Sequence, residues 1–367
     1  MPLARCLIEY WESHARHLSR SEAERNNLAI WNSYFEGYEV KDIKAKQQRE
    51  FLAYLINAVT EPTDGSLPKH RYAKSTISGI FKTGVAAITF AWRENMLNTA
   101  IPFITPAKEF KKHVVKPKLE TKPLDFDEIV ALFEAASTTR LFRLMLIMLG
   151  TSCRPAAAIE LEGIQINKKE KTINLLRPGV EQNNKYRPTV RLPSFIEAIY
   201  HKANLVHQGP YTFANPKRPV DTVRKSWETT LGQAKVPEVV LTPNKNIDGE
   251  VVYKPLTGNI VLYSFRHTLA KWFRTCSVDA WHVSAQLGHI KEGSQVTEIY
   301  ASSDPDYLHD VLEATEVLFA IVYQRSQRLQ TCEELKKYAP DQNLLNKYRK
   351  ILEKIGVTDF WQENEIK

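Results

Sequence analysis

The chain has 367 residues, of which 43% are hydrophobic and 25% are charged, a composition typical of a folded protein and unlike that of a disordered or collagen-like chain. Its length indicates two domains at ~100–200 residues per domain, and no apolar run reaches the ~18 residues that a membrane helix needs. The N-terminus lacks the apolar core of a signal peptide. The four cysteines stand far apart, so we expect reduced thiols in a cytoplasmic protein and neither a disulfide nor a zinc framework.

The net charge of +8 is unevenly distributed along the chain. Residues 1–120 carry a net charge of +5, residues 121–300 carry +6 and residues 301–367 carry −3. Two basic blocks followed by an acidic tail indicate that the first 300 residues face a polyanion and that the tail does not. Many basic proteins bind no nucleic acid, so charge alone leaves DNA or RNA binding open.

The first 105 residues are expected to form an all-α domain. Apolar residues recur at helical spacing between Ile77 and Trp92, and Ser75 could cap the start of this helix. Further helices are predicted at residues 7–18, 22–34 and 41–59. The segment Glu61–Lys69 contains proline and glycine and is expected to be a loop. Periodicity alone predicts no more than a generic helical bundle.

A basic, proline-rich linker is expected at residues 106–123, which contain three prolines and six lysines. Prolines block helix formation and favour an extended spacer. The lysines are those of a solvated linker or of a segment that lies along a phosphate backbone. Both interpretations stay open at this point.

The region from residue 124 to residue 305 has a mixed pattern. Helices are predicted at residues 125–136, 141–149, 195–207 and 222–234, and they resume at Tyr263. Two strands, residues 171–176 and 188–193, flank a polar loop, and residues 237–259 read as a Pro/Gly-rich loop. We therefore expect a mostly α fold with a small antiparallel β-sheet, an α+β catalytic domain.

Three segments of this region contain residue types that suit phosphate chemistry. They are GTSCRPAAAIEL with Arg154, LYSFRHTLAKWF with Tyr263, Arg266 and His267, and QLGHIKEGSQVTEIYA with Gly288, His289 and Tyr300. Their order and spacing, together with the predicted basic hairpin, resemble the tyrosine recombinases, the phage-type integrases that cut and rejoin DNA at specific sites. The resemblance covers residues 5–305, and it is specific because four separated features agree in order.

The resemblance implies a role for each matching side chain. The Tyr300 hydroxyl would attack a DNA phosphate and form a 3′-phosphotyrosine link, which keeps the bond energy, so that no ATP is needed. Arg154 and Arg266 would clamp the non-bridging oxygens, and His289 would move a proton or bind the phosphate. A lysine of the hairpin loop serves the family as general acid, and Lys185 is the matching lysine here. No cofactor and no metal are implied.

This sequence departs from the family pattern at two positions. Tyr263 stands where histidine is most common, and its hydroxyl can bind a phosphate oxygen but cannot act as an imidazolium. Ala157 stands where an acidic residue that orients the neighbourhood is frequent. His267 has either an auxiliary role at the phosphate or a packing role at its helix. Cys153 beside Arg154 is interpreted as a packing residue.

The resemblance also assigns domains and partners. It implies a core-binding domain at residues 1–105, a catalytic domain at 124–305 and a helical acidic tail at 306–367, whose helix at 306–330 docks either on a neighbouring protomer or on its own domain. Apolar positions after Thr331 suggest one more amphipathic helix. The implied partners are double-stranded DNA, further copies of the chain in a synaptic dimer or tetramer and DNA-bending accessory proteins, with no membrane, in the cytoplasm at the nucleoid.

Alternative functions stay open from the sequence. One is a topoisomerase-like enzyme that relaxes DNA without paired sites, and another is a site-specific DNA-binding protein that has lost catalysis. The retained Arg154, Arg266, His289 and Tyr300 argue against lost catalysis. Helices begin almost at the first residue, so either an arm-binding domain is not needed or the chain is a fragment.

Overall fold

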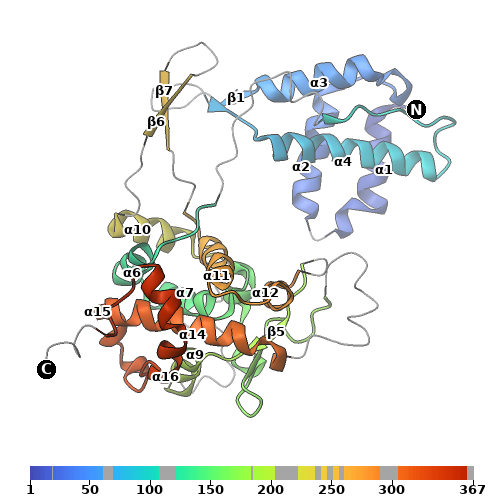
Figure 1. Ribbon diagram of the computed structural model, residues 1–367. Coiled ribbons are helices and arrows are strands. Elements are labelled where there is room, and N and C mark those ends of the chain that lie inside the picture. Colours follow the sequence, from blue (N-terminus) through green and yellow to red (C-terminus); the bar gives the residue numbers. More distant parts are fainter. Residues whose placement is uncertain are drawn as a thin grey trace, which may run out of the picture. The chain divides into compact units, whose positions relative to one another are not determined.

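The computed structural model of the chain describes residues 1–18, 20–60, 69–106, 121–182, 185–202, 222–235, 241–245, 251–255, 260–289 and 305–361 (Figure 1). The chain forms two compact units. The first contains Met1–Leu119 and Lys245–Val251, and the second contains Glu120–Asn244 and Val252–Lys367. Each unit has its own hydrophobic core.

The first unit is a helical bundle built around one tryptophan. Its helices are α1 (Leu3–Ser13), α2 (Ser21–Tyr34), α3 (Ala45–Asn57) and α4 (Lys74–Arg93), with short helices η1 (Ala15–His17) and η2 (Val40–Asp42) and an antiparallel pair β1 (Val59–Thr60) and β2 (Lys69–His70). Trp31 is fully buried, and its Nε1 donates to the Ile80 carbonyl at 2.7 Å. Gly84 makes this packing possible, because a Cβ there would lie 2.0 Å from the Trp31 ring. Ser75 lies inside the first turn of α4, after the N-cap residue Ala73, so the predicted Ser75 cap is wrong.

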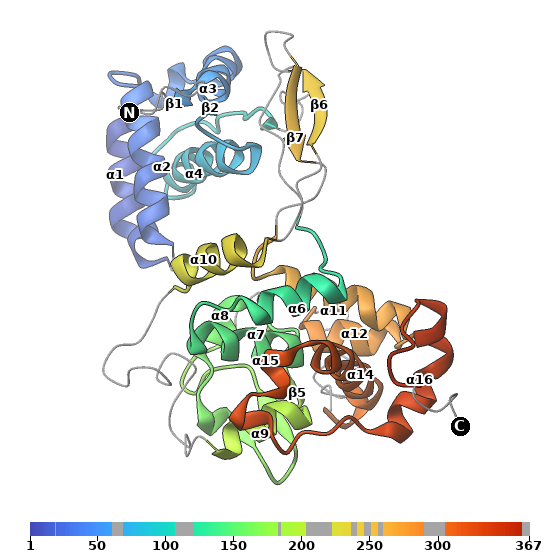
Figure 2. The same ribbon diagram turned by 90° about the vertical axis from the view of Figure 1, so that its left-hand side faces the viewer.

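The second unit is also mostly helical (Figure 2). Its elements are α6 (Phe126–Glu134), α7 (Thr139–Thr151), α8 (Pro155–Glu160), η4 (Gly163–Gln165), β3 (Ile166–Asn167), β4 (Thr172–Asn174), β5 (Thr189–Arg191), α9 (Ser194–Lys202), α10 (Arg224–Ala234), β6 (Leu241–Lys245), β7 (Val251–Pro255), α11 (Ser264–Thr275), α12 (Ala280–Leu287), η6 (Pro305–Leu308), α14 (His309–Arg325), α15 (Gln327–Gln330), η7 (Glu333–Leu335) and α16 (Gln342–Lys354). Asp125 starts α6 with a capping box, in which its side chain accepts from the Glu128 amide.

The β-structure is small and antiparallel. The two predicted hairpin strands pair as β4 and β5, with Ile173 opposite Val190, and β3 extends them to the order β3-β4-β5. Strands β6 and β7 form a separate two-stranded sheet inside residues 237–259, where a loop was expected. The run Val251–Tyr253 contains β-branched and aromatic residues that favour strands. The expectation of a loop, which rested on the prolines and glycines, is therefore wrong for these residues.

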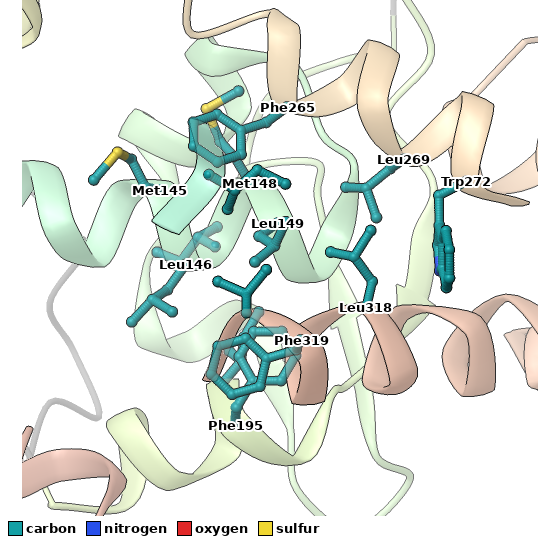
Figure 3. Close-up of a cluster of buried hydrophobic side chains, with 14 of the residues drawn as sticks. Met145, Leu146, Met148, Leu149, Phe195, Phe265, Leu269, Trp272, Leu318 and Phe319 are labelled. Atoms are coloured by element: carbon teal, nitrogen blue, oxygen red, sulfur yellow. The ribbon is translucent and has the colours of Figure 1, made fainter. Parts of the chain in front are cut away.

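Helix α7 is the centre of the second core (Figure 3). Ten of its residues are buried, and they contact side chains of α9, α11 and α14. Phe195 of α9 stacks on Phe319 of α14 with ring centroids 3.7 Å apart. Trp272 of α11 donates its Nε1 to the Ala314 carbonyl of α14 at 2.6 Å. The helix predicted at 306–330 therefore packs on its own domain.

The structure confirms the predicted fold class, which is a mostly helical chain with one small three-stranded antiparallel sheet. None of the helices in the described part of the chain is long and apolar enough to cross a bilayer. In the same residues, no group of three or more His, Cys, Asp or Glu side chains is placed to hold a metal ion.

Candidate active site

The turn after α7 places Arg154. Helix α7 ends at Thr151, and Ser152 adopts a left-handed conformation with φ 56° that reverses the chain. Pro155 opens α8 at its first position, where its missing amide costs nothing. A residue before proline is driven to extended backbone, and Arg154 accordingly has ψ 147° as the N-cap of α8. The local sequence thus fixes the backbone of Arg154 at the junction of α7 and α8.

Arg266 is held in the interior by backbone carbonyl groups. It lies on α11 and is only 4% exposed. Its Nη1 donates to the Ser152 carbonyl at 2.9 Å, and its Nη2 donates to the Leu287 carbonyl at the end of α12. The same Nη2 lies 3.2 Å from Nε2 of His289. A planar guanidinium can contact these groups from different elements at once, because its donors point outward in a rigid fork.

His289 is fixed by the end of α12. Gly288 ends this helix with φ +61°, and the His289 amide donates to the Ser284 carbonyl at 2.9 Å. The Ser284 hydroxyl donates to the His289 carbonyl at 2.9 Å. Buried Gln286 ties the same helix to α7, since its Nε2 donates to the Thr151 carbonyl at 2.8 Å. Both α11 and α12 are therefore fastened to the turn that carries Arg154.

Arg154, Arg266 and His289 influence one another electrostatically. Burial, and then the charge of Arg154, lower the pKa of the Arg266 guanidinium. Burial, and then the charges of Arg266 and Arg154, lower the pKa of His289 below its usual value. Since a guanidinium only donates hydrogen bonds, Nε2 of a neutral His289 accepts and its proton lies on Nδ1. The site concentrates positive charge, which a phosphate would neutralise.

Tyr263 and His267 lie on the same side of α11 as Arg266. Their rings meet edge to face with centroids 5.2 Å apart, and the Arg266 guanidinium carbon lies 5.9 Å from the Tyr263 ring centroid. A pocket of about 380 Å³ opens between α11 and α12. Its lining includes Tyr263, Arg266, His267, Arg274 and His289, and none of the described residues that line it is acidic.

The loop predicted to carry the general acid approaches Arg154. Nη1 of Arg154 donates to the Tyr186 carbonyl at 2.9 Å, one residue after the exposed Lys185. Gly288 allows this approach, because a Cβ there would lie 2.5 Å from the same carbonyl oxygen. The predicted nucleophile Tyr300 lies outside the described residues.

Cys153 and Ala157 are both buried beside Arg154. Burial raises the pKa of the Cys153 thiol to about 11, so the thiol is protonated near neutral pH, in keeping with a packing residue. Ala157 leaves α8 without a carboxylate at that position. The anchor of Arg154 is the Tyr186 carbonyl, which is a backbone group.

Five of the sequence-predicted positions meet around the end of α7. Arg154, Arg266 and His289 lie together, Tyr263 lies beside Arg266, and the backbone that follows Lys185 reaches Arg154. Sequence reasoning missed the supports, which are Ser152, Gln286 and the carbonyls of Leu287 and Tyr186. Every residue has a backbone carbonyl, so residue identity does not show which carbonyls accept these bonds. Near these supports, only Gly288 could have been noticed in the sequence, as a glycine beside a candidate site residue.

Comparisons with known proteins give the class of fold. No protein-family model and no curated protein matches the sequence. A lambda integrase dimer bound to a core site is similar, with TM-score 0.53 and 12% identity over 80% of this chain and 97% of that one. The Tn1549 transposon integrase in complex with transposon right end DNA is similar, with TM-score 0.56 and 12% identity over 84% of this chain and 97% of that one. A lambda integrase tetramer bound to a Holliday junction is also similar, with TM-score 0.52 and 13% identity over 80% of this chain and 79% of that one. The chain therefore has the fold of the tyrosine recombinases.

Proposed function

We propose that this protein is a site-specific DNA recombinase, an integrase that cleaves and rejoins strands through a 3′-phosphotyrosine intermediate. The observation that carries the proposal is the cluster of Arg154, Arg266 and His289 at the end of α7. Two fixed guanidiniums suit the oxygens of a phosphodiester, whose charge rises in the transition state. The fold shared with two DNA-bound integrases supports the same conclusion.

The chemistry balances without a cofactor. The Tyr300 oxygen attacks phosphorus, and the bond from phosphorus to the 5′ oxygen breaks. Lys185 gives a proton to that leaving oxygen. The proton of the Tyr300 hydroxyl passes either to Nε2 of neutral His289, which then gives up its hydrogen bond from Arg266, or to water while Nδ1–H of His289 binds the phosphate. Tyr263 donates a hydrogen bond to a phosphate oxygen. Attack by a 5′ hydroxyl on the phosphotyrosine reverses these steps and joins the strands.

Partners of the protein follow from the same proposal. The substrate is double-stranded DNA, and copies of the chain assemble on it as a dimer or tetramer, as integrases do in two of the similar structures. DNA-bending accessory proteins join this assembly. We place the enzyme at the nucleoid, in the service of a prophage or another mobile genetic element.

The test is capture of the covalent intermediate. Nicked suicide duplexes that tile the DNA flanking its gene are incubated with the protein, and adducts are resolved on denaturing gels and mapped by mass spectrometry. An adduct on Tyr300 that forms in EDTA without ATP is expected, and Tyr300→Phe should bind DNA but form none. A normal adduct from Tyr300→Phe would move the nucleophile, with Tyr307 as the next candidate, and a strict metal requirement would refute the mechanism.

The same assay tests the arginine clamp and the alternatives. Arg154→Lys keeps the charge and loses the planar fork, so cleavage should fall by orders of magnitude while DNA binding changes little. Wild-type cleavage by this variant would remove its catalytic assignment. Relaxation of supercoiled DNA without paired sites would favour a topoisomerase, and binding without any adduct would favour a catalytically inactive DNA-binding protein.

A further inference from the structure

The segment that follows Arg154 and the loop that carries Lys185 are joined by two ion pairs. Glu160, the last residue of α8, lies with its Oε2 2.6 Å from Nη1 of Arg187. Glu162 lies with its Oε1 3.0 Å from Nε of Arg177, at the other end of the same loop. Both ends of the loop are therefore bound to the segment that directly follows Arg154.

Gln182 fastens the loop to itself. Its Nε2 donates to the Arg187 carbonyl at 2.8 Å, and its Oε1 accepts from the Arg187 amide at 3.1 Å. These two bonds resemble those between paired residues of antiparallel strands, and they form two residues before β5 begins. Arg187 thus has its backbone held by Gln182 and its guanidinium held by Glu160.

These contacts fix the backbone beside Lys185. Tyr186 lies between Lys185 and the doubly held Arg187, and its carbonyl accepts from Arg154. A lysine side chain has many rotamers, so the position of its ammonium group depends on a fixed Cα. A general acid must come within hydrogen-bond reach of the leaving oxygen, and a misplacement of ~1 Å can cost ~10²-fold in rate.

We propose that Glu160 and Gln182 are positioning residues for proton transfer by Lys185. The inference rests on the proposed function and concerns a single step of it, departure of the 5′ oxygen. Glu160 supplies α8 with the carboxylate that Ala157 lacks, three residues further along the same helix. Neither side chain touches the phosphate in this proposal, and both act through the backbone of residues 185–187.

A sulfur substitution in the DNA isolates this step. When sulfur replaces the 5′ bridging oxygen at the scissile phosphate, the leaving group is a thiolate, which needs no proton because a thiol is a far stronger acid than an alcohol. Single-turnover cleavage is measured for the oxygen and sulfur duplexes with wild type, Lys185→Ala, Glu160→Gln and Gln182→Ala. We expect the last two variants to cleave the oxygen duplex at least ~10-fold more slowly and the sulfur duplex at the wild-type rate.

Glu160→Gln is the more telling variant, because it removes an acidic residue and leaves every cation in place. Weaker DNA binding therefore cannot explain slower cleavage by this variant. Glu197→Gln, which breaks the partly exposed Lys171–Glu197 ion pair of the same unit, is the matched control and should cleave both duplexes normally.

The outcomes separate this inference from the proposed function. Normal cleavage of the oxygen duplex by Glu160→Gln and Gln182→Ala would overturn the inference and leave the recombinase intact. Equal slowing on both duplexes would also overturn it, because a general distortion of the site does not depend on the leaving group. Failure of sulfur to rescue Lys185→Ala would instead refute the assignment of Lys185 as the acid.

Discussion

At the scale of single residues, backbone groups position the side chains of the candidate site. Arg266 binds the carbonyls of Ser152 and Leu287, and Arg154 binds that of Tyr186. A guanidinium has five N–H donors, which is more than these carbonyl bonds use. In the proposed reaction, a site held in this way would lower the cost of reorganisation in the transition state.

Ser152→Gly should stabilise the protein by about 1 kcal/mol. A serine in the left-handed region costs ~1–2 kcal/mol, and the buried Ser152 hydroxyl has no hydrogen-bond partner among the residues that the structure describes. The greater freedom of glycine in the unfolded chain offsets part of the gain. Urea unfolding measures the change. Ser326→Gly is the control and should destabilise, because the buried Ser326 hydroxyl donates to Glu134 and accepts from the Leu329 amide.

Gly288→Ala should abolish most DNA cleavage. Its Cβ would lie 2.5 Å from the Tyr186 carbonyl oxygen and 2.9 Å from Pro188, so the loop that meets Arg154 must move. Single-turnover cleavage should fall by ~10²-fold or more. Gly356→Ala is the matched control, since Gly356 has φ +79° and open space around it. Equal cleavage by both variants would show that the close approach at Gly288 is unimportant.

His289 should make the fold sensitive to mild acid. Its pKa in the folded chain is lowered by burial and by the two arginines. As pH falls through the usual histidine range, the unfolded chain takes up a proton before the folded chain does, so stability is lost. Urea unfolding at pH 7.5 and at pH 5.5 should show a smaller loss for His289→Gln than for wild type. Identical losses would contradict the lowered pKa.

At the scale of elements, the C-terminal helices complete the core of the second unit. Helix α14 contributes nine buried residues, and α16 adds Leu345, Tyr348 and Leu352. Arg328 of α15 donates to the carbonyls of Glu134 and Ala136 and thereby closes the end of α6. The acidic tail therefore belongs to the second unit and stabilises it within the same chain.

Phe319→Ala should lower the free energy of unfolding by ~3–5 kcal/mol, the usual cost of emptying a buried phenylalanine site. Phe319 is fully buried and stacks on Phe195. The loss should not depend on protein concentration, because both rings belong to one chain. Tyr307→Ala, at a side chain that is 67% exposed, should change stability by less than ~0.5 kcal/mol. A concentration-dependent loss would indicate that α14 packs on a neighbouring copy.

At the scale of the whole molecule, the charge blocks differ from the two compact units, because the acidic last 67 residues belong to the second unit. The first 120 residues carry a net charge of +5 and residues 121–300 carry +6, while the last 67 carry −3. Separate hydrophobic cores allow each unit to fold around its own interior. The proposed function predicts that both basic blocks, with the lysine-rich segment 106–123, contact one duplex.

The salt dependence of binding should reveal whether both units contact DNA. Log affinity falls with log salt by ~0.9 for each phosphate neutralised, and a grip by both units should involve at least ~6 phosphates. Residues 121–367 alone should show a clearly shallower slope on the same fragment. A thermal melt first establishes that this segment is folded. Equal slopes would mean that the first unit makes no phosphate contacts.

The sequence by itself determined the helices, the fold class and the residue types of the site. Helical periodicity predicted α2, α7 and α14 because it records which side chains each helix buries. The order of Arg154, Arg266 and His289 pointed to phosphate chemistry for a comparable reason, since guanidinium and imidazole are fixed by residue identity. Lys185 and Tyr300 stay predictions from the same motifs.

Only the tertiary structure decided how the site is held and where the tail packs. The carbonyls of Ser152, Leu287 and Tyr186 could belong to any residue, so no motif announces them. Strands β6 and β7 pair across residues that read as a loop, because pairing depends on a partner strand and not on one segment alone. From the sequence, the apolar stripe on α14 could pack on its own domain or on a neighbouring copy. In the structure it packs against α7, α9 and α11, and this complementary surface exists only once the chain has folded.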